Sequence, residues 1–528
     1  MRDIQLPGRS VSHGWRGGAA TSQPLASLAA IDILRSGGNA VDAAIAACAV
    51  LCVVEPMGTG IGGDCFALCW IERSQKLVAI NGSGLSPAGL TSAWLKEKGE
   101  TISETNVHAV TVPGAVDAWY RLNADFGRLT MAQVLEPAIA LAQNGFAVTP
   151  VIAGEWSGSV KKLSADANTK ALYLPGGRSP AAGSIFKNPG LATALSRIAV
   201  QGREGFYAGK TAREMVSYLR SLGGAHTLDD FATQQSIYVE PLRCRYRDAD
   251  VVQMPPNAQG LTTLLMLNIL SQFDLSGHSP VSALRYHLTT EAARLAFNFR
   301  DRLVGDPAHA GSEIAEALSE TTARRAASMI DPEKTMSYPT NIGSFERDTV
   351  CLSTVDSERN VCSLVNSLYF QFGTGLSTPD SAILFHNRGL GFQSQDGHPG
   401  QLGPRKRPSH TILPGMVLKR GRPWLALGVK GAAFQPIGQA SIITSIIDNG
   451  YDIQEAVDAP RCGYNNDDVV EVERGVASDV RQALVALGHK VVDAKAPLGG
   501  AQVLQIDDER QTIAGASDCR KDGMAICF

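Results

Sequence analysis

The sequence lacks the segments that mark membrane and secreted proteins. Its longest apolar run, residues 43–54, is too short to span a bilayer and is typical of a buried helix. Residues 1–8 have neither the basic start nor the apolar stretch of a signal peptide. Ten cysteines in 528 residues do not suggest a disulfide scaffold, and several lie in apolar segments typical of buried thiols. We therefore expect a cytoplasmic protein with no membrane partner.

Long runs of charge and the common catalytic motifs are also missing. The net charge is −3, and the densest basic cluster, residues 405–407, indicates a solvated loop rather than a nucleic-acid surface. No G-x-S-x-G elbow and no H-E-x-x-H spacing occur, so we expect no serine triad, no metal and no cofactor. Residues 58–63 match G-x-G-x-x-G, but a helical pattern precedes them and a strand pattern follows, the reverse of a dinucleotide site.

What remains is a long globular chain of alternating helix and strand patterns. Hydrophobic residues make up 44%, with 53 glycines, and no internal repeat is evident. Strand patterns flanked by helices favour a layered α/β sandwich. We expect helices at 25–35, 41–54, 131–143, 211–222, 261–270, 284–303, 313–329, 439–448 and 478–487, and strands at 66–70, 425–429 and 501–506.

A β-hairpin is predicted for residues 349–372, with its turn at 357–360. In residues 335–347, before the hairpin, apolar residues follow neither a helical nor a strand spacing. This stretch indicates an exposed linker suited to cleavage. If the bond before Thr349 breaks, this residue gains a free α-amine beside its own hydroxyl. Such an amine has a pKa of about 7.7–8, close to what a general base needs at neutral pH. Thr349 is therefore either an ordinary strand residue or a nucleophile that carries its own base.

The chain resembles the γ-glutamyltransferase family of N-terminal-nucleophile (Ntn) hydrolases along almost its whole length. Nine segments in the family's order carry this resemblance. They are residues 36–44 (SGGNAVDAA), 111–116 (TVPGAV), 240–246 (EPLRCRY), 254–256 (MPP), 305–307 (GDP), 372–375 (FGTG), 406–408 (KRP), 458–461 (DAPR) and 515–518 (GASD).

The resemblance implies a precursor that cuts itself between Asp348 and Thr349. Residues 1–348 and 349–528 would then form a large and a small subunit, together one interleaved four-layer αββα domain, possibly in a dimer of such heterodimers. Thr349 would be the nucleophile, and Ser367 falls where the family has a threonine that orients it. Gly431 and Ala432 fall where paired glycines form the oxyanion hole; alanine keeps its N–H.

Several substrate-binding positions depart from the family's pattern. The family's carboxylate-binding arginine aligns with Ser83, and two serines align with His410 and Thr411. The polar residues that hold a γ-glutamyl group align with Tyr369, Arg388 and Gly391. An ammonium beside Arg388 would be repelled.

Arg388 could instead bind a carboxylate, with donors from His410, Thr411 and Tyr369 and with Lys430 next to the oxyanion loop. This pattern resembles the oxamate amidohydrolase branch and predicts a small anionic amide, best oxamate, as substrate. Two alternatives stay open: a γ-glutamyltransferase or glutathione hydrolase with a modified pocket, and an idle relative that only binds a small acid.

Overall fold

A computed structural model describes residues 8–309, 311, 313–336, 349–465 and 468–528. Two seven-stranded sheets form its centre. In spatial order, the strands of one sheet are β19 (Met524–Cys527), β2 (Gly18–Thr21), β10 (Val350–Val355), β11 (Val361–Ser367), β3 (Asp64–Ile71), β4 (Lys76–Gly82) and β7 (Ile237–Val239). Those of the other are β1 (Ser12–Gly14), β18 (Thr512–Ser517), β17 (Gly500–Asp507), β13 (Arg422–Lys430), β12 (Pro414–Lys419), β9 (Ala249–Gln253) and β8 (Leu242–Tyr246).

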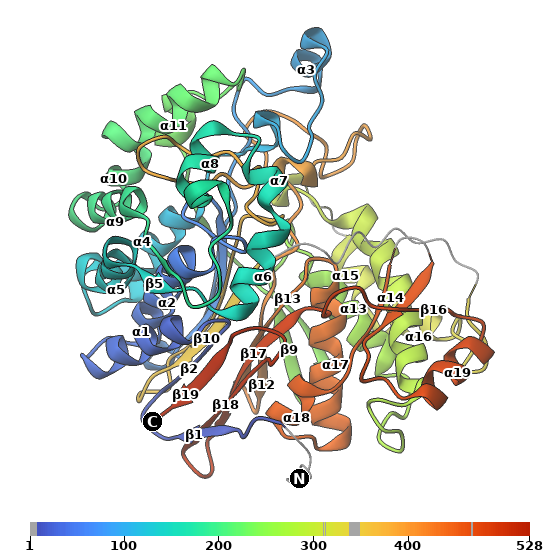
Figure 1. Cartoon of the computed structure of the whole chain (residues 1–528). Helices are drawn as coiled ribbons and strands as arrows, with labels where there is room; N and C mark the ends of the chain where they lie inside the picture. Colours follow the sequence, from blue (N-terminus) through green and yellow to red (C-terminus); the bar gives the residue numbers. More distant parts are fainter. Residues whose placement is uncertain (1–7, 310, 312, 337–348, 466–467) are drawn as a thin grey trace.

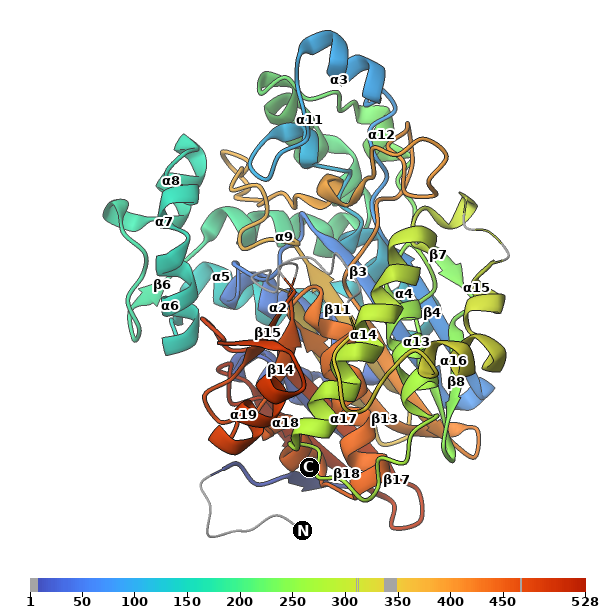
Figure 2. The ribbon, with the colours of Figure 1, turned by 90° about the vertical axis from the view of Figure 1, so that its right-hand side faces the viewer.

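The two sheets face each other, and helices cover both outer faces (Figures 1 and 2). The first sheet is covered by α1 (Pro24–Arg35), α2 (Ala40–Val54), α4 (Ala115–Phe126), α5 (Met131–Asn144) and α9 (Pro189–Gln201). The second is covered by α13 (Gly260–Leu270), α14 (Ala283–Leu303), α17 (Phe434–Asn449) and α18 (Ile453–Asp458). Apolar residues of both sheets, such as Phe66, Cys351 and Met416, fill the layer between them. The fold is therefore a four-layer αββα sandwich.

Smaller elements surround these layers. The remaining helices are α3 (Ser92–Lys98), α6 (Pro150–Gly158), α7 (Val160–Leu163), α8 (Ala167–Tyr173), α10 (Glu204–Tyr207), α11 (Gly209–Ser221), α12 (Leu228–Ala232), α15 (Glu313–Ala317), α16 (Glu320–Ala327) and α19 (Ser478–Ala486). The remaining strands are β5 (Phe146–Ala147), β6 (Ile185–Phe186), β14 (Cys462–Tyr464), β15 (Val469–Val472) and β16 (Lys490–Asp493).

Each sheet combines strands from both sides of position 349. In the first sheet β10 lies between β2 and β11, and β11 in turn pairs with β3. Neither sheet can form from residues before 349 alone, or from those after it alone. The two parts of the chain are interleaved.

Some of the expected elements were wrong in extent. The helix expected at 439–448 is α17, which begins earlier, at Phe434. The helix expected at 313–329 is broken into α15 and α16, because the Ser319 side chain caps the second helix at the Thr322 N–H. The second hairpin arm ends at Ser367 rather than at residue 372. Within the described part of the chain, no helix is long and apolar enough to cross a membrane.

Candidate active site

Thr349 lies immediately before β10, at the end of the hairpin farthest from its turn. Val350 pairs with Asn366, so Thr349 faces Ser367, the last residue of β11. The Thr349 side chain is 1% exposed, and its Oγ1 lies 3.0 Å from Ser367 Oγ. The predicted nucleophile and the residue predicted to orient it are thus in direct contact. Asp348, on the other side of the predicted scissile bond, and residues 337–347 of the expected linker lie outside the described residues.

Donors from two other residues fix the Ser367 hydroxyl. Ser367 Oγ accepts the Tyr369 N–H at 2.8 Å and a longer bond from Arg388 Nη2 at 3.4 Å. Within the Thr349–Ser367 pair, either hydroxyl can donate to the other. Ser367 is therefore held beside the oxygen that would develop negative charge.

Arg388 begins a short 3₁₀ turn, Arg388–Gly391, and is completely buried. Its guanidinium stacks on the Tyr369 ring at 4.0 Å, and its Nη1 donates to Thr411 Oγ1 at 3.3 Å. Tyr369 has a positive φ of 80°, a strained conformation for a residue with a side chain, which places its ring beneath the guanidinium. A fixed positive charge thus lies one side chain away from Thr349.

A buried carboxylate lies below His410. Asp64, at the start of β3, contacts His410 Nε2 at 2.9 Å and His386 Nδ1 at 3.2 Å, and it also accepts the N–H groups of Gly84 and Gly114. Burial alone would raise the pKa of the Asp64 carboxyl, but the two imidazoles hold it well below its usual range. Asp64 therefore stays ionised.

His410 itself is neutral. Burial, together with the nearby Arg388 charge, lowers its pKa to about 3. Since Nε2 faces the Asp64 carboxylate, the single proton lies on Nε2, and Nδ1 carries a lone pair. Nδ1 has no hydrogen-bond partner among the described residues. The expectation that His410 supplies a further donor was therefore wrong: its unused nitrogen is an acceptor.

The predicted oxyanion loop joins β13 to α17. Gly431 has a φ of 117° and Ala432 a φ of 46°, and α17 begins two residues later at Phe434. The positive end of the α17 dipole thus lies next to the two N–H groups that would bind an oxyanion. Gln259 Nε2 donates to both Ala432 O and Thr411 O at 2.8 Å, which ties this loop to the Arg388 side of the site.

Lys430, the last residue of β13, forms a buried ion pair. Its Nζ lies 3.1 Å from Glu55 Oε1, and both side chains are at most 3% exposed. A Cβ on Gly58 would lie 3.5 Å from both Glu55 Oε1 and the carbonyl carbon of Thr349, so this pair lies close beneath the nucleophile. Lys430 therefore holds the start of the oxyanion loop beside Thr349.

Ser83 is linked to His410 through Asn257. Its Oγ accepts from Asn257 Nδ2 at 3.0 Å, and the Asn257 carbonyl accepts the His410 N–H. Arg407 Nε donates to the Ser83 carbonyl at 3.2 Å. An arginine therefore lies next to position 83, although Ser83 itself stands where the family has its carboxylate-binding arginine. Sequence reasoning missed the residues that support the site: Glu55, Asp64, Gln259, His386 and Arg407. Only two of the segments that carry the family resemblance indicated these supporting residues. Segment 111–116 contacts His386, and segment 406–408 contacts Ser83.

The family model described as gamma-glutamyltranspeptidase matches residues 26–528. The chain belongs to this family. The "Glutathione hydrolase-like YwrD proenzyme" of Bacillus subtilis (strain 168) is 36% identical over 95% of this chain and 96% of its own length. The oxamate amidohydrolase proenzyme of Klebsiella pneumoniae is 29% identical over 97% and 98%. The crystal structure of cephalosporin acylase from Bacillus halodurans has a TM-score of 0.94 at 35% identity, covering 100% of this chain and 99% of that one.

These matches confirm the Ntn-hydrolase fold and an amide-hydrolysing enzyme made as a self-processing precursor. The names of these three proteins refer to three different substrates, so family membership alone leaves the substrate open.

Proposed function

We propose that this protein is an amidohydrolase that acts on a small amide with a negatively charged acyl group, using Thr349 as nucleophile. The precursor is cut between Asp348 and Thr349 into residues 1–348 and 349–528. The new α-amine accepts the proton of the Thr349 hydroxyl as Oγ1 attacks the amide carbon. The Gly431 and Ala432 N–H groups bind the oxyanion, each worth roughly 10²–10³ in rate.

Collapse of the tetrahedral intermediate breaks the C–N bond. The departing amine takes the proton held on the α-ammonium, and an ester links the acyl carbon to Thr349 Oγ1. Water then attacks this ester and gives one proton to the α-amine. The ester C–O bond breaks, the acid leaves, and Thr349 Oγ1 takes that proton from the α-ammonium. The Ser367 hydrogen bond to Oγ1 stabilises the alkoxide in both halves of the cycle.

One observation carries the substrate class: a completely buried guanidinium, Arg388, is hydrogen-bonded to the residue that holds the nucleophile. Arg388 donates to the Ser367 and Thr411 hydroxyls, and a guanidinium can bind a carboxylate with two parallel hydrogen bonds. An acyl group with an anion one or two bonds from its carbonyl would fit. Oxamate, cleaved to oxalate and ammonia, is the smallest such amide, and the oxamate amidohydrolase relative supports it.

A glutathione hydrolase is the second candidate, and Asp64 is the observation that favours it. The Asp64 carboxylate lies behind His410, whose Nδ1 is an acceptor, so an ammonium placed there would be stabilised. The glutathione hydrolase-like relative supports this candidate too.

A substrate panel with an arginine variant separates the candidates. The panel contains oxamate, a longer dicarboxylic monoamide, its neutral isostere, a cephalosporin amide and glutathione. Arg388→Met should lower kcat/KM for the anionic amides at least about 100-fold more than for the neutral isostere, because it removes a buried charge pair. The exposed Arg405, changed to Met, is the control.

An equal loss on all substrates would remove Arg388 from substrate binding, and preferred turnover of glutathione would establish the second candidate. A protein that stays as one chain and turns over nothing would be an idle relative.

A further inference from the structure

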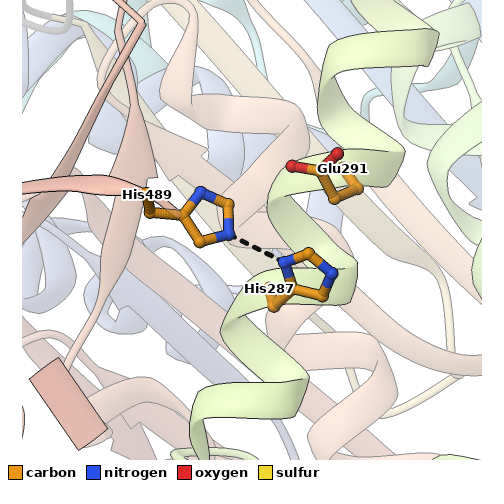
Figure 3. A group of neighbouring side chains, drawn as sticks. All are labelled: His287, Glu291 and His489. Carbon is orange, nitrogen blue, oxygen red and sulfur yellow. Dashed lines mark hydrogen bonds between the residues drawn. The ribbon is translucent and has the colours of Figure 1, made fainter. Parts of the chain in front are cut away.

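His287, Glu291 and His489 form a buried cluster far from Thr349 in sequence (Figure 3). His287 and Glu291 lie one turn apart on α14, and His489 lies just before β16. The three side chains are at most 4% exposed, and one ligand atom of each lies within 4.8 Å of the other two. Because His489 is 202 positions from His287, no spacing in the sequence indicates this group.

The hydrogen bonds fix the tautomers of both histidines. His287 Nε2 lies 2.8 Å from the Asp331 carbonyl, which only accepts, so this nitrogen carries the hydrogen and Nδ1 the lone pair. His287 Nδ1 lies 2.7 Å from His489 Nε2, which therefore carries the hydrogen between the two rings. His489 Nδ1 has no partner among the described residues. His287, with a carbonyl behind one ring nitrogen and the other nitrogen turned into the cluster, has the usual arrangement of a metal-binding histidine.

The charges around the cluster can accept a dication. Glu291 accepts from Thr335 Oγ1 at 3.1 Å and the Met336 N–H at 2.9 Å, and Arg294 Nε lies 3.3 Å from it. Arg294 also pairs with Asp468 at 2.8 Å. Two carboxylates and one guanidinium sum to a formal charge of −1, so a bound dication would bring the group to +1.

We propose that His287 Nδ1, His489 Nε2 and one Glu291 oxygen bind a transition-metal dication of the zinc type, with water in the fourth position. Two imidazoles and a carboxylate are a common ligand set for Zn²⁺ and disfavour Mg²⁺ and Ca²⁺. With Zn–N bonds of about 2.0–2.1 Å, tetrahedral geometry puts the nitrogens about 3.3 Å apart. The two rings must therefore separate by roughly half an ångström, and the His489 proton moves from Nε2 to Nδ1.

The site would act as a clamp. The ligands hold residues 331–336 through Asp331, Thr335 and Met336, and the Thr335 N–H donates to Leu487 O at 2.8 Å beside His489. This is the last described segment before the predicted cleavage site. A metal would fasten it to α14 and to the strand that follows His489, without any part in the chemistry at Thr349.

Metal analysis tests this proposal directly. Full-length protein equilibrated with Zn²⁺ and desalted should retain one equivalent, and Co²⁺ should give visible ligand-field absorption of a low-coordinate site. His489→Asn and Glu291→Gln should each weaken Zn²⁺ binding at least about 10-fold. His278→Asn, which changes an exposed histidine, should bind as wild type does. Circular dichroism establishes that each variant is folded.

The proposal would be overturned if the wild-type protein retained no more Zn²⁺ than folded His489→Asn. The three side chains would then hold residues 331–336 by hydrogen bonds alone. Zinc retained equally by all four proteins would place the metal elsewhere and overturn it as well.

Discussion

Thr349 Oγ1 and Ser367 Oγ lie 3.0 Å apart across the open end of the β10–β11 hairpin. Ser367 Oγ also accepts N–H donors from Tyr369 and Arg388. The hairpin thereby places the proposed nucleophile and the hydroxyl proposed to stabilise it on adjacent strands.

Ser367→Ala should slow both precursor cleavage and amide turnover, by roughly 10- to 100-fold, because the alkoxide loses one directed hydrogen bond. Ser367→Thr, which keeps the hydroxyl, should retain most of both rates. Timed gel electrophoresis and steady-state kinetics measure the two effects. Full activity in the alanine variant would show that Ser367 has no part in holding Thr349.

Breaking the buried Lys430–Glu55 ion pair should lower the stability of the fold, whichever of the two residues is replaced. Lys430→Met and Glu55→Gln should each lower the free energy of unfolding, by up to about 3–5 kcal/mol, since each removes the closest ion-pair contact of a buried charge; Lys430 also lies 4.0 Å from Glu155. The double variant should lose clearly less than the sum of the two. Denaturant titration of all four proteins gives the coupling energy, and strictly additive losses would contradict a direct pairing.

Acid should destabilise the fold through two buried histidines. Burial lowers the pKa of His226 to about 4 and, with the Arg388 charge, that of His410 to about 3. In the unfolded chain both pKa values return to about 6.5. Below that pH the unfolded chain binds protons that the folded chain does not, so stability present at neutral pH is lost as the pH falls from about 6.5 towards 4.

For each histidine that is protonated only in the unfolded chain, the free energy of unfolding falls by about 1.4 kcal/mol per pH unit in the middle of this window. His226→Asn and His410→Asn should therefore each flatten the dependence of unfolding free energy on pH, while His278→Asn, at an exposed position, should leave it as in wild type. An unchanged slope in both buried-site variants would mean that these imidazoles are protonated in the folded state.

Local patterns were enough to predict the hairpin and many of the long helices, but not α4 or α9. The helix expected at 41–54 corresponds to α2, whose residues are all buried, and the hairpin arms pair in register from Val350 with Asn366 to Val355 with Val361. The break between α15 and α16 was missed because it depends on one side-chain cap at Ser319, within a segment whose composition favours helix throughout.

The supporting part of the site could not be predicted in this way. Asp64 and His410 are 346 positions apart, and Glu55 and Lys430 are 375 apart. Only the packing of the two sheets brings these groups together, and isolated acids and bases carry no signal of their partners. The resemblance predicted Thr349 as the nucleophile, whereas the donor or acceptor role of His410 depends on its contact with Asp64.

The mass of the mature protein under denaturing conditions tests the central claim most directly. Wild-type protein should give two fragments whose masses match residues 1–348 and 349–528, and Thr349→Ala should give one uncut chain, with Thr354→Val as a control that is cut normally. A fully active wild-type protein of a single undivided mass, or a Thr349→Ala variant cut at the same bond, would contradict the account.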